Sequence, residues 1–199
     1  MNMYFLKRLA SNASLEEIQK HSIKDMHVRG FDYICLHRSH DLTVKLYFCD
    51  TYVENLSEVV SPHDHRYDFD TFVVAGEYTD FTYREDANGE VFERFEYRTP
   101  MLGGDGFTWS NESRLAVSDE YTMKAGDLFS HQAENIHTIR INQAGTVLCL
   151  MQYSDRHGLD FTQTFMKDRK SPNLDGLYEK FTVDQVKKRL EQIGLKGMK

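Results

Sequence analysis

The sequence has few of the residues that interrupt or cross-link a chain. Of its 199 residues, only three are prolines and three are cysteines. No apolar run approaches the roughly 18 residues that a membrane-spanning helix requires. The first residues, MNMYFLKRLASN, have no apolar core followed by a small-residue cleavage site, so they do not resemble a signal peptide. We therefore expect a cytoplasmic protein that has no membrane partner.

Basic residues are also in short supply. The chain has 24 lysines and arginines against 31 aspartates and glutamates, which gives a formal charge of −7. Nucleic-acid binding requires a basic surface that neutralises phosphates, so we expect no nucleic-acid partner. Hydrophobic residues at 40% and charged residues at 28% are typical of an ordinary globular protein. A chain of this length can build one hydrophobic core, which predicts a single domain over residues 1–199.

The three cysteines, Cys35, Cys49 and Cys149, are odd in number and each lies in an apolar run. This placement favours buried, reduced thiols in a cytosolic protein. A Cys35–Cys49 bond between neighbouring strands is the open alternative. Their spacing matches neither a zinc ribbon nor a redox motif.

A capping signal lies near each end of the chain. Ser14 and Glu17 have the spacing of a capping box and predict a short helix to about His21. Thr182 and Gln185 repeat this spacing, and the apolar residues that follow fall at helical intervals. We therefore predict a C-terminal helix over about 182–193 that packs on the outside of the main body.

Strand-like segments fill the region between the two predicted helices. Asn88-Gly89 predicts a hairpin turn between two of them, and Gly103–Gly106 and Ala125–Asp127 predict further loops. Many short strands at regular spacing predict an all-β sandwich, jelly roll or closed barrel, here over about 30–155. The predicted strands, rich in Val, Ile, Tyr, Phe and Thr, are Phe31–His37, Thr43–Cys49, Val59–His65, Phe69–Ala75, Glu77–Arg84, Val91–Arg98, Arg114–Met123, Ile136–Ile141 and Thr146–Tyr153.

The histidines carry the strongest indication of chemistry. His63 and His65 are two residues apart, and in a strand such residues project from the same face. Both rings could then reach one ion inside a barrel. Three residues separate His65 from position 69, and six more precede Gly76. Farther along, His137 lies eleven residues after Gly126.

These intervals resemble the two motifs of the cupin superfamily. The resemblance covers about Val59 to Asn142 and implies a double-stranded β-helix, a jelly-roll barrel, with one divalent metal ion held by His63, His65 and His137. The metal-binding glutamate of the family falls on Phe69, which cannot ligate. The remaining three-histidine set resembles that of cysteine dioxygenase and related enzymes. His131, Asp68 and Asp70 are alternate ligands, although strand alternation turns both aspartates away unless a bulge intervenes.

The resemblance implies a metal-dependent enzyme of small molecules, with a non-haem iron dioxygenase-type oxidoreductase as its best-defined form. Fe(II) is the favoured ion, and Zn, Ni or Mn would support Lewis-acid chemistry or ligand holding. Tyr67 and Tyr153 are candidates to line the substrate pocket, and Arg98 is a candidate carboxylate anchor. A metal-binding cupin without turnover and a metal-free sugar isomerase or epimerase are alternatives. A homodimer is the expected assembly.

Overall fold

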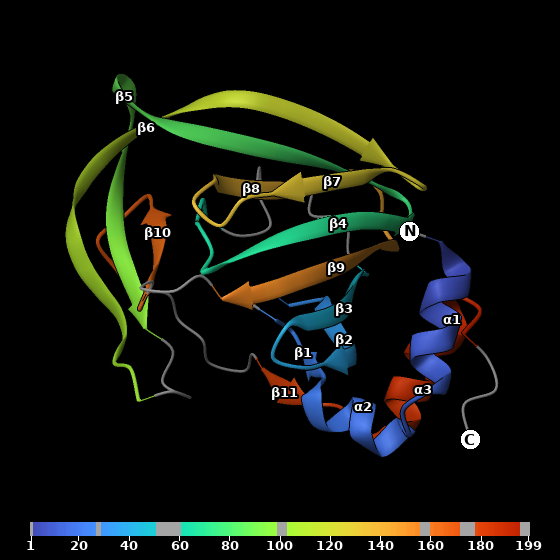
Figure 1. The fold of residues 1–199 in the computed structure, drawn as a ribbon. Helices are drawn as coiled ribbons and strands as arrows, with labels where there is room; N and C mark the ends of the chain where they lie inside the picture. The colour runs from blue at the N-terminus through green and yellow to red at the C-terminus, as the bar shows by residue number, and fades with distance from the viewer. Residues whose placement is uncertain are drawn as a thin grey trace.

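The computed structural model describes residues 2–26, 29–50, 61–98, 103–155, 160–171 and 178–195. In these ranges strands dominate, and the helices lie toward the two ends of the chain (Figure 1). The elements are α1 (Met3–Ser11), α2 (Leu15–His21), β1 (Ile23–Lys24), β2 (Phe31–Arg38), β3 (Leu42–Cys49), β4 (Tyr67–Ala75), β5 (Glu77–Arg98), β6 (Gly106–Lys124), β7 (Leu128–His131), β8 (Ile136–Ile141), β9 (Thr146–Asp155), β10 (Thr162–Met166), β11 (Glu179–Lys180) and α3 (Val183–Gln192).

The strands form two antiparallel sheets. The larger has the order β11-β1-β2-β3-β9-β4-β7, and the smaller has β10-β5-β6 with β8 also paired to β5. From β4 to β10 the chain passes repeatedly between them, because β4, β7 and β9 belong to one sheet and β5, β6, β8 and β10 to the other. This alternation is the winding of a jelly roll. The predicted all-β class and jelly-roll architecture are confirmed.

The central strands of the large sheet, such as β3, are buried on both faces. Alternate residues of β3, such as Val44 and Leu46, pack with the three helices, and these helices lie together beside this sheet in Figure 1. The intervening residues, such as Tyr47 and Cys49, belong to a second apolar cluster with Tyr78 and Ile141 of the small sheet. The helices therefore cover the outside of the large sheet, and the second cluster fills the space between the two sheets.

The helical predictions are largely confirmed. Ser14 Oγ accepts from the Glu17 amide at 3.2 Å and begins α2. Thr182 begins α3 with a full capping box. The sequence reasoning missed α1, whose buried Leu6 and Ala10 give only a narrow apolar stripe. Among the described residues, no helix is long and apolar enough to cross a membrane. All three cysteines are buried and free.

The predicted hairpin at Asn88-Gly89 is wrong. Segments 77–85 and 90–98 form one long strand, β5, and both pair antiparallel with β6, so the chain does not reverse between them. Glu85 and Glu90 both lie opposite Leu115, which makes the four residues between them a bulge. Gly89 is needed for close approach, because a Cβ there would lie 2.5 Å from the Leu115 backbone. The reversal instead lies between Arg98 and Gly106, at the predicted glycine-rich loop.

The predicted strand Val59–His65 is also wrong in its described part. Residues 59 and 60 lie outside the described ranges, and residues 61–66 contain only isolated bridges at His63. Ser61-Pro62 precedes the histidines, and a proline cannot donate to a strand ladder. The segment is therefore fixed by individual hydrogen bonds to its neighbours.

Candidate metal centre

The segment that carries His63 and His65 lies alongside the ends of two strands. His63 exchanges backbone hydrogen bonds with His137 of β8, at 3.0 and 2.9 Å. On its other side, the Phe165 amide of β10 donates to the Pro62 carbonyl at 2.8 Å. The His65 amide donates to the Ala133 carbonyl at 2.9 Å. These contacts place the histidine pair beside His137 although about 70 residues separate them in the sequence.

Asp64, between the two histidines, is hydrogen-bonded to β10. Its carboxylate accepts from the Gln163 amide at 2.6 Å and from the Gln163 side chain at 2.8 Å. Burial raises the pKa of Asp64 to about 6, although the Gln163 hydrogen bonds oppose this effect. Asp64 therefore points toward β10, and both histidines lie near His137.

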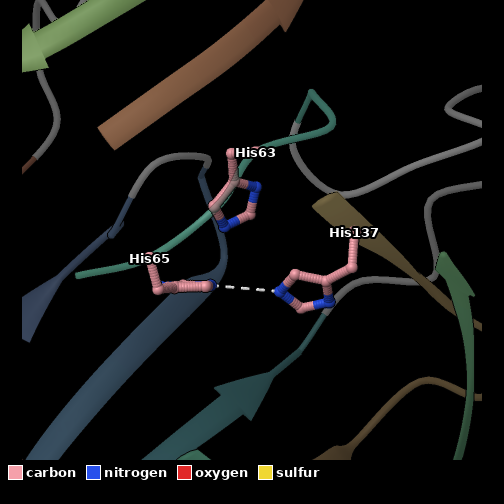
Figure 2. Close-up of side chains that lie close together, drawn as sticks. All are labelled: His63, His65 and His137. Atoms are coloured by element: carbon pink, nitrogen blue, oxygen red, sulfur yellow. Dashed lines mark hydrogen bonds between the residues drawn. The ribbon is translucent and has the colours of Figure 1, made fainter. Parts of the chain in front are cut away.

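The three imidazoles converge, as Figure 2 shows. One nitrogen from each of His63, His65 and His137 lies within 4.8 Å of the others. The Nε2 atoms of His65 and His137 are 3.1 Å apart. Two nitrogens bound at about 2.1 Å and at right angles to one ion would be about 3.0 Å apart. The spacing of this pair therefore fits two adjacent ligands of a single ion.

Hydrogen bonds to Nδ1 orient two of the rings. His63 Nδ1 donates to the Ser61 carbonyl at 2.9 Å, and His137 Nδ1 donates to Asp80 Oδ2 at 3.3 Å. Because these acceptors have no proton to give, each ring carries its proton on Nδ1 and its lone pair on Nε2. Histidine ligands of metals are commonly held by such acceptors.

Asp80 is the functional residue that sequence reasoning missed. It lies on β5, is 1% exposed, and also accepts from His131 Nε2 at 3.0 Å. Burial raises its pKa, but the hydrogen bonds from His131 and His137 outweigh this and lower it to about 2. A signal was present, because Asp80 has the parity of Tyr78, a core residue of the same strand.

Burial favours the neutral form of two of the three rings, those of His65 and His137. It lowers the pKa of His65 well below the usual value, and the neighbouring histidines reinforce the effect. Burial also lowers the pKa of His137, although Asp80 acts in the opposite direction. A neutral imidazole presents a lone pair to a metal, whereas a protonated one repels it. The donor set thus suits a divalent first-row ion.

Phe69 occupies the edge of this group, where the cupin motif has its glutamate. Its ring centroid lies 4.7 Å from those of His65 and His131 and 5.5 Å from that of His137. The bulge that aspartate ligation required does occur, between Tyr67 and Phe69. The two aspartates nevertheless have other partners.

Asp68 Oδ1 accepts from the Ala133 amide at 2.7 Å, and the Asp70 carboxylate accepts from Ser130 at 2.5 Å and Tyr153 at 2.6 Å. Neither aspartate belongs to a cluster of potential ligands among the described residues. We therefore leave both out of the ligand set that we propose below.

His131 belongs to a second group with Asp80 and His137, whose ligand atoms also lie within 4.8 Å of one another. All three residues are buried, and Asp80 Oδ2 already accepts from both rings. Within the part of the chain that the structure describes, His131 Nδ1 has no hydrogen-bond partner, so His131 is the alternate ligand that the geometry still allows. The first group is better suited to chemistry, because His63 and His65 are only partly buried and a substrate needs access.

The three residues predicted to contact the substrate, Tyr67, Tyr153 and Arg98, have different surroundings. The Tyr67 ring lies beside His65, with centroids 5.1 Å apart. Tyr153 is 40% exposed and donates to Asp70. Arg98 pairs with Glu96 at 3.0 Å and lies over the Phe161 ring. Only Tyr67 has a described contact with a histidine of the site.

No family model and no curated protein sequence matches this chain. It is similar in fold to many solved structures, among them the following three. KdgF from Halomonas sp. has 14% identity and a TM-score of 0.42, over 69% of this chain and 91% of that one. An RmlC-like cupin from Shewanella frigidimarina has 18% identity and a TM-score of 0.40, over 69% of this chain and 88% of that one. Hydroxypropylphosphonic acid epoxidase from S. wedmorenis has 13% identity and a TM-score of 0.42, over 68% of this chain and 56% of that one. Any assignment of chemistry therefore depends on this chain's own residues.

Proposed function

We propose that this chain is a metal-dependent, cupin-type enzyme that transforms a small molecule at an ion held by His63, His65 and His137. The supporting observation is the convergence of three imidazole nitrogens within 4.8 Å, with one pair 3.1 Å apart. Neutral imidazoles are not otherwise expected to gather around one point. Hydrogen bonds to Ser61 and Asp80 turn two of the lone pairs toward that point.

The finer form of the proposal is an oxidoreductase that uses Fe(II) and dioxygen. Three imidazole ligands would leave the full charge of a divalent ion in place, with room for a substrate that chelates through two atoms and for one molecule of dioxygen. Fe(II) held by these residues would supply electrons to dioxygen. The chain's part is to orient His137 through Asp80 and to close one side of the site with Phe69.

Metal analysis of freshly purified protein tests the ligand set. We expect roughly one divalent ion per chain in the parent. His63→Ala, His65→Ala and His137→Ala should each abolish its retention and leave the fold intact. His40→Ala is the matched control, because His40 is exposed and pairs with Asp41 at the surface. Retention of metal by a ligand variant would show that its assignment is wrong, and loss in His131→Ala would move the site to the second group.

Oxygen consumption tests the finer proposal. Fe(II)-loaded protein should take up dioxygen in the presence of a suitable thiol or diketone, and His65→Ala should not. Ligand binding without any oxygen uptake over such a panel would instead favour a protein that holds a small ligand without turnover.

One observation favours a second function, proton transfer without a metal, as in a sugar isomerase or epimerase. The Asp80–His137 pair resembles an oriented general base, with the His137 lone pair directed at the site. A parent protein that retains no ion, yet loses isomerase activity in His137→Ala, would support this function against the first.

A further inference from the structure

Lys45 is a buried cation for which the proposed ligand set gives no role. It lies on β3 between Val44 and Leu46, and only 6% of it is exposed. Val44 and Leu46 pack with the helices, so Lys45 has the opposite parity and faces the space between the sheets. Its register partners Cys35 and Leu150 are also on this inner side. An inward lysine on a central strand requires an explanation, because burial of an unpaired ammonium is costly.

Aromatic rings take the place of a counter-ion. Lys45 Nζ lies 5.4 Å from the centroid of the Tyr33 ring and 5.7 Å from that of Tyr67. Within the described ranges, no carboxylate forms an ion pair with it. Cation–π contacts recover only part of the hydration that an ammonium loses on burial. The Lys45 ammonium group is thus held in place and is available to bind an anion.

This ammonium is close to the proposed metal site. The Tyr67 ring contacts both Lys45 and His65, and its centroid lies 5.1 Å from that of His65. Arg38, Arg66 and Asp155 also act electrostatically on Tyr67. Asp155 is already paired with Arg66 at 3.5 Å. Asp155 is thus engaged by Arg66 and not by Lys45.

We infer that Lys45 is the anchor for an anionic group, a carboxylate, of the small molecule that binds at the histidine site. The inference rests on the proposed function, because it requires a substrate with one end at the ion and the other at Lys45. It also replaces the carboxylate anchor expected at Arg98, which Glu96 occupies. The substrate class is then a metal-chelating molecule with a further carboxylate.

Ligand titration of the Co(II)-loaded protein, followed in the visible spectrum, tests this role. The probes are azide, which needs only the ion; acetate; and the dicarboxylates succinate and glutarate, which differ in length and are too long to close a small chelate ring on the ion. We expect at least one dicarboxylate to bind about 10-fold tighter than acetate, as one charge-assisted hydrogen bond provides. Lys45→Met should abolish this preference without changing the azide affinity, and Lys45→Arg should retain part of it.

Lys24→Met is the matched control, because Lys24 lies over the Phe181 ring and outside the inner cluster. It should bind every probe as the parent does. Thermal unfolding confirms that each variant is folded. If Lys45→Met keeps the preference for dicarboxylates, the role of Lys45 is overturned and the proposed function stands. The same holds if the parent binds azide but shows no preference for a dicarboxylate over acetate. Failure of Co(II) to bind the parent would overturn this inference together with the proposed function.

Discussion

Replacement of Asp80 by asparagine tests how the site is oriented. Asp80 is 1% exposed and accepts from His131 at 3.0 Å and from His137 at 3.3 Å. The asparagine side chain would be nearly isosteric, but its amide carries no charge and offers one oxygen and two N–H donors. The amide oxygen could still accept from both rings at the Oδ2 position, but without a charge, and the amide nitrogen would replace Oδ1, which has no hydrogen-bond partner among the described residues. The His137 lone pair would then be held toward His65 less firmly.

The magnitude follows from the pKa and the hydrogen bonds. A pKa of about 2, against 3.8 for an unperturbed aspartate, corresponds to about 2 kcal/mol of stabilisation by the ionised form. Loss of the charged acceptor from two buried rings should lower the free energy of unfolding of the apoprotein by about 3 kcal/mol. Loss of an orienting acceptor of a metal-binding histidine typically weakens metal affinity by about 10- to 100-fold.

Two assays separate orientation from folding. Denaturant unfolding of the apoprotein gives the stability change, and chelator competition at a temperature where both proteins are folded gives the metal affinity. Asp41→Asn is the matched control, since Asp41 forms the same Asp–His contact with His40 at the exposed surface. It should leave both quantities unchanged. Parental metal affinity in Asp80→Asn would refute the claim that Asp80 orients His137.

The pH dependence of stability at acid pH checks independently that Asp80 is ionised in the folded protein. The folded pKa of Asp80 lies below its unfolded value, so its stabilisation is complete above about pH 4 and is lost as the pH falls toward 2. The difference in unfolding free energy between the parent and Asp80→Asn should therefore shrink across this window. A difference that stays constant with pH would contradict the assigned ionisation.

Three further predictions concern neighbouring residues. Burial lowers the pKa of Lys45 from 10.5 to about 8, so the unfolded state binds more protons between these pH values and the stability of the parent should rise with pH there. Lys45→Met should lack this rise and should unfold at a higher temperature at pH 7, because the substitution removes a destabilisation of about 3 kcal/mol. Asp64→Ala leaves the Gln163 amide without its acceptor, so the free energy of unfolding in denaturant should fall by about 2 kcal/mol and metal retention should weaken. If neither quantity changes, Asp64 does not position the histidines. Phe69→Glu introduces a carboxylate beside His65 and His137, so chelator competition should show about 10-fold tighter metal binding, although the apoprotein should unfold at lower denaturant. Weaker metal binding would mean that position 69 does not face the ion.

Local signals in the sequence predicted much of the fold. Strand runs and helix caps depend on neighbouring residues, and the caps at Ser14 and Thr182 are in place. Asn88-Gly89 misled because the same dipeptide permits a turn or a bulge, and the choice depends on whether β6 pairs with both halves of β5. That pairing is a long-range property that the dipeptide does not encode.

The site shows the same division. Motif spacing predicted that His63, His65 and His137 would meet, and the structure brings them together. The reason given for the first two was wrong, because they do not lie on a strand and are instead held by hydrogen bonds to Ala133 and His137. Asp80 and Lys45 were missed because neither belongs to a motif. Their importance depends on burial, which arises only when the two sheets face each other.

An anomalous diffraction map of metal-loaded crystals, collected at the absorption edge of the ion found by elemental analysis, tests the central claim most directly. We predict one peak about 2.1 Å from nitrogens of His63, His65 and His137, with Asp80 still bonded to His137 Nδ1. A peak among Asp80, His131 and His137, or no peak near His63 and His65, would contradict the account.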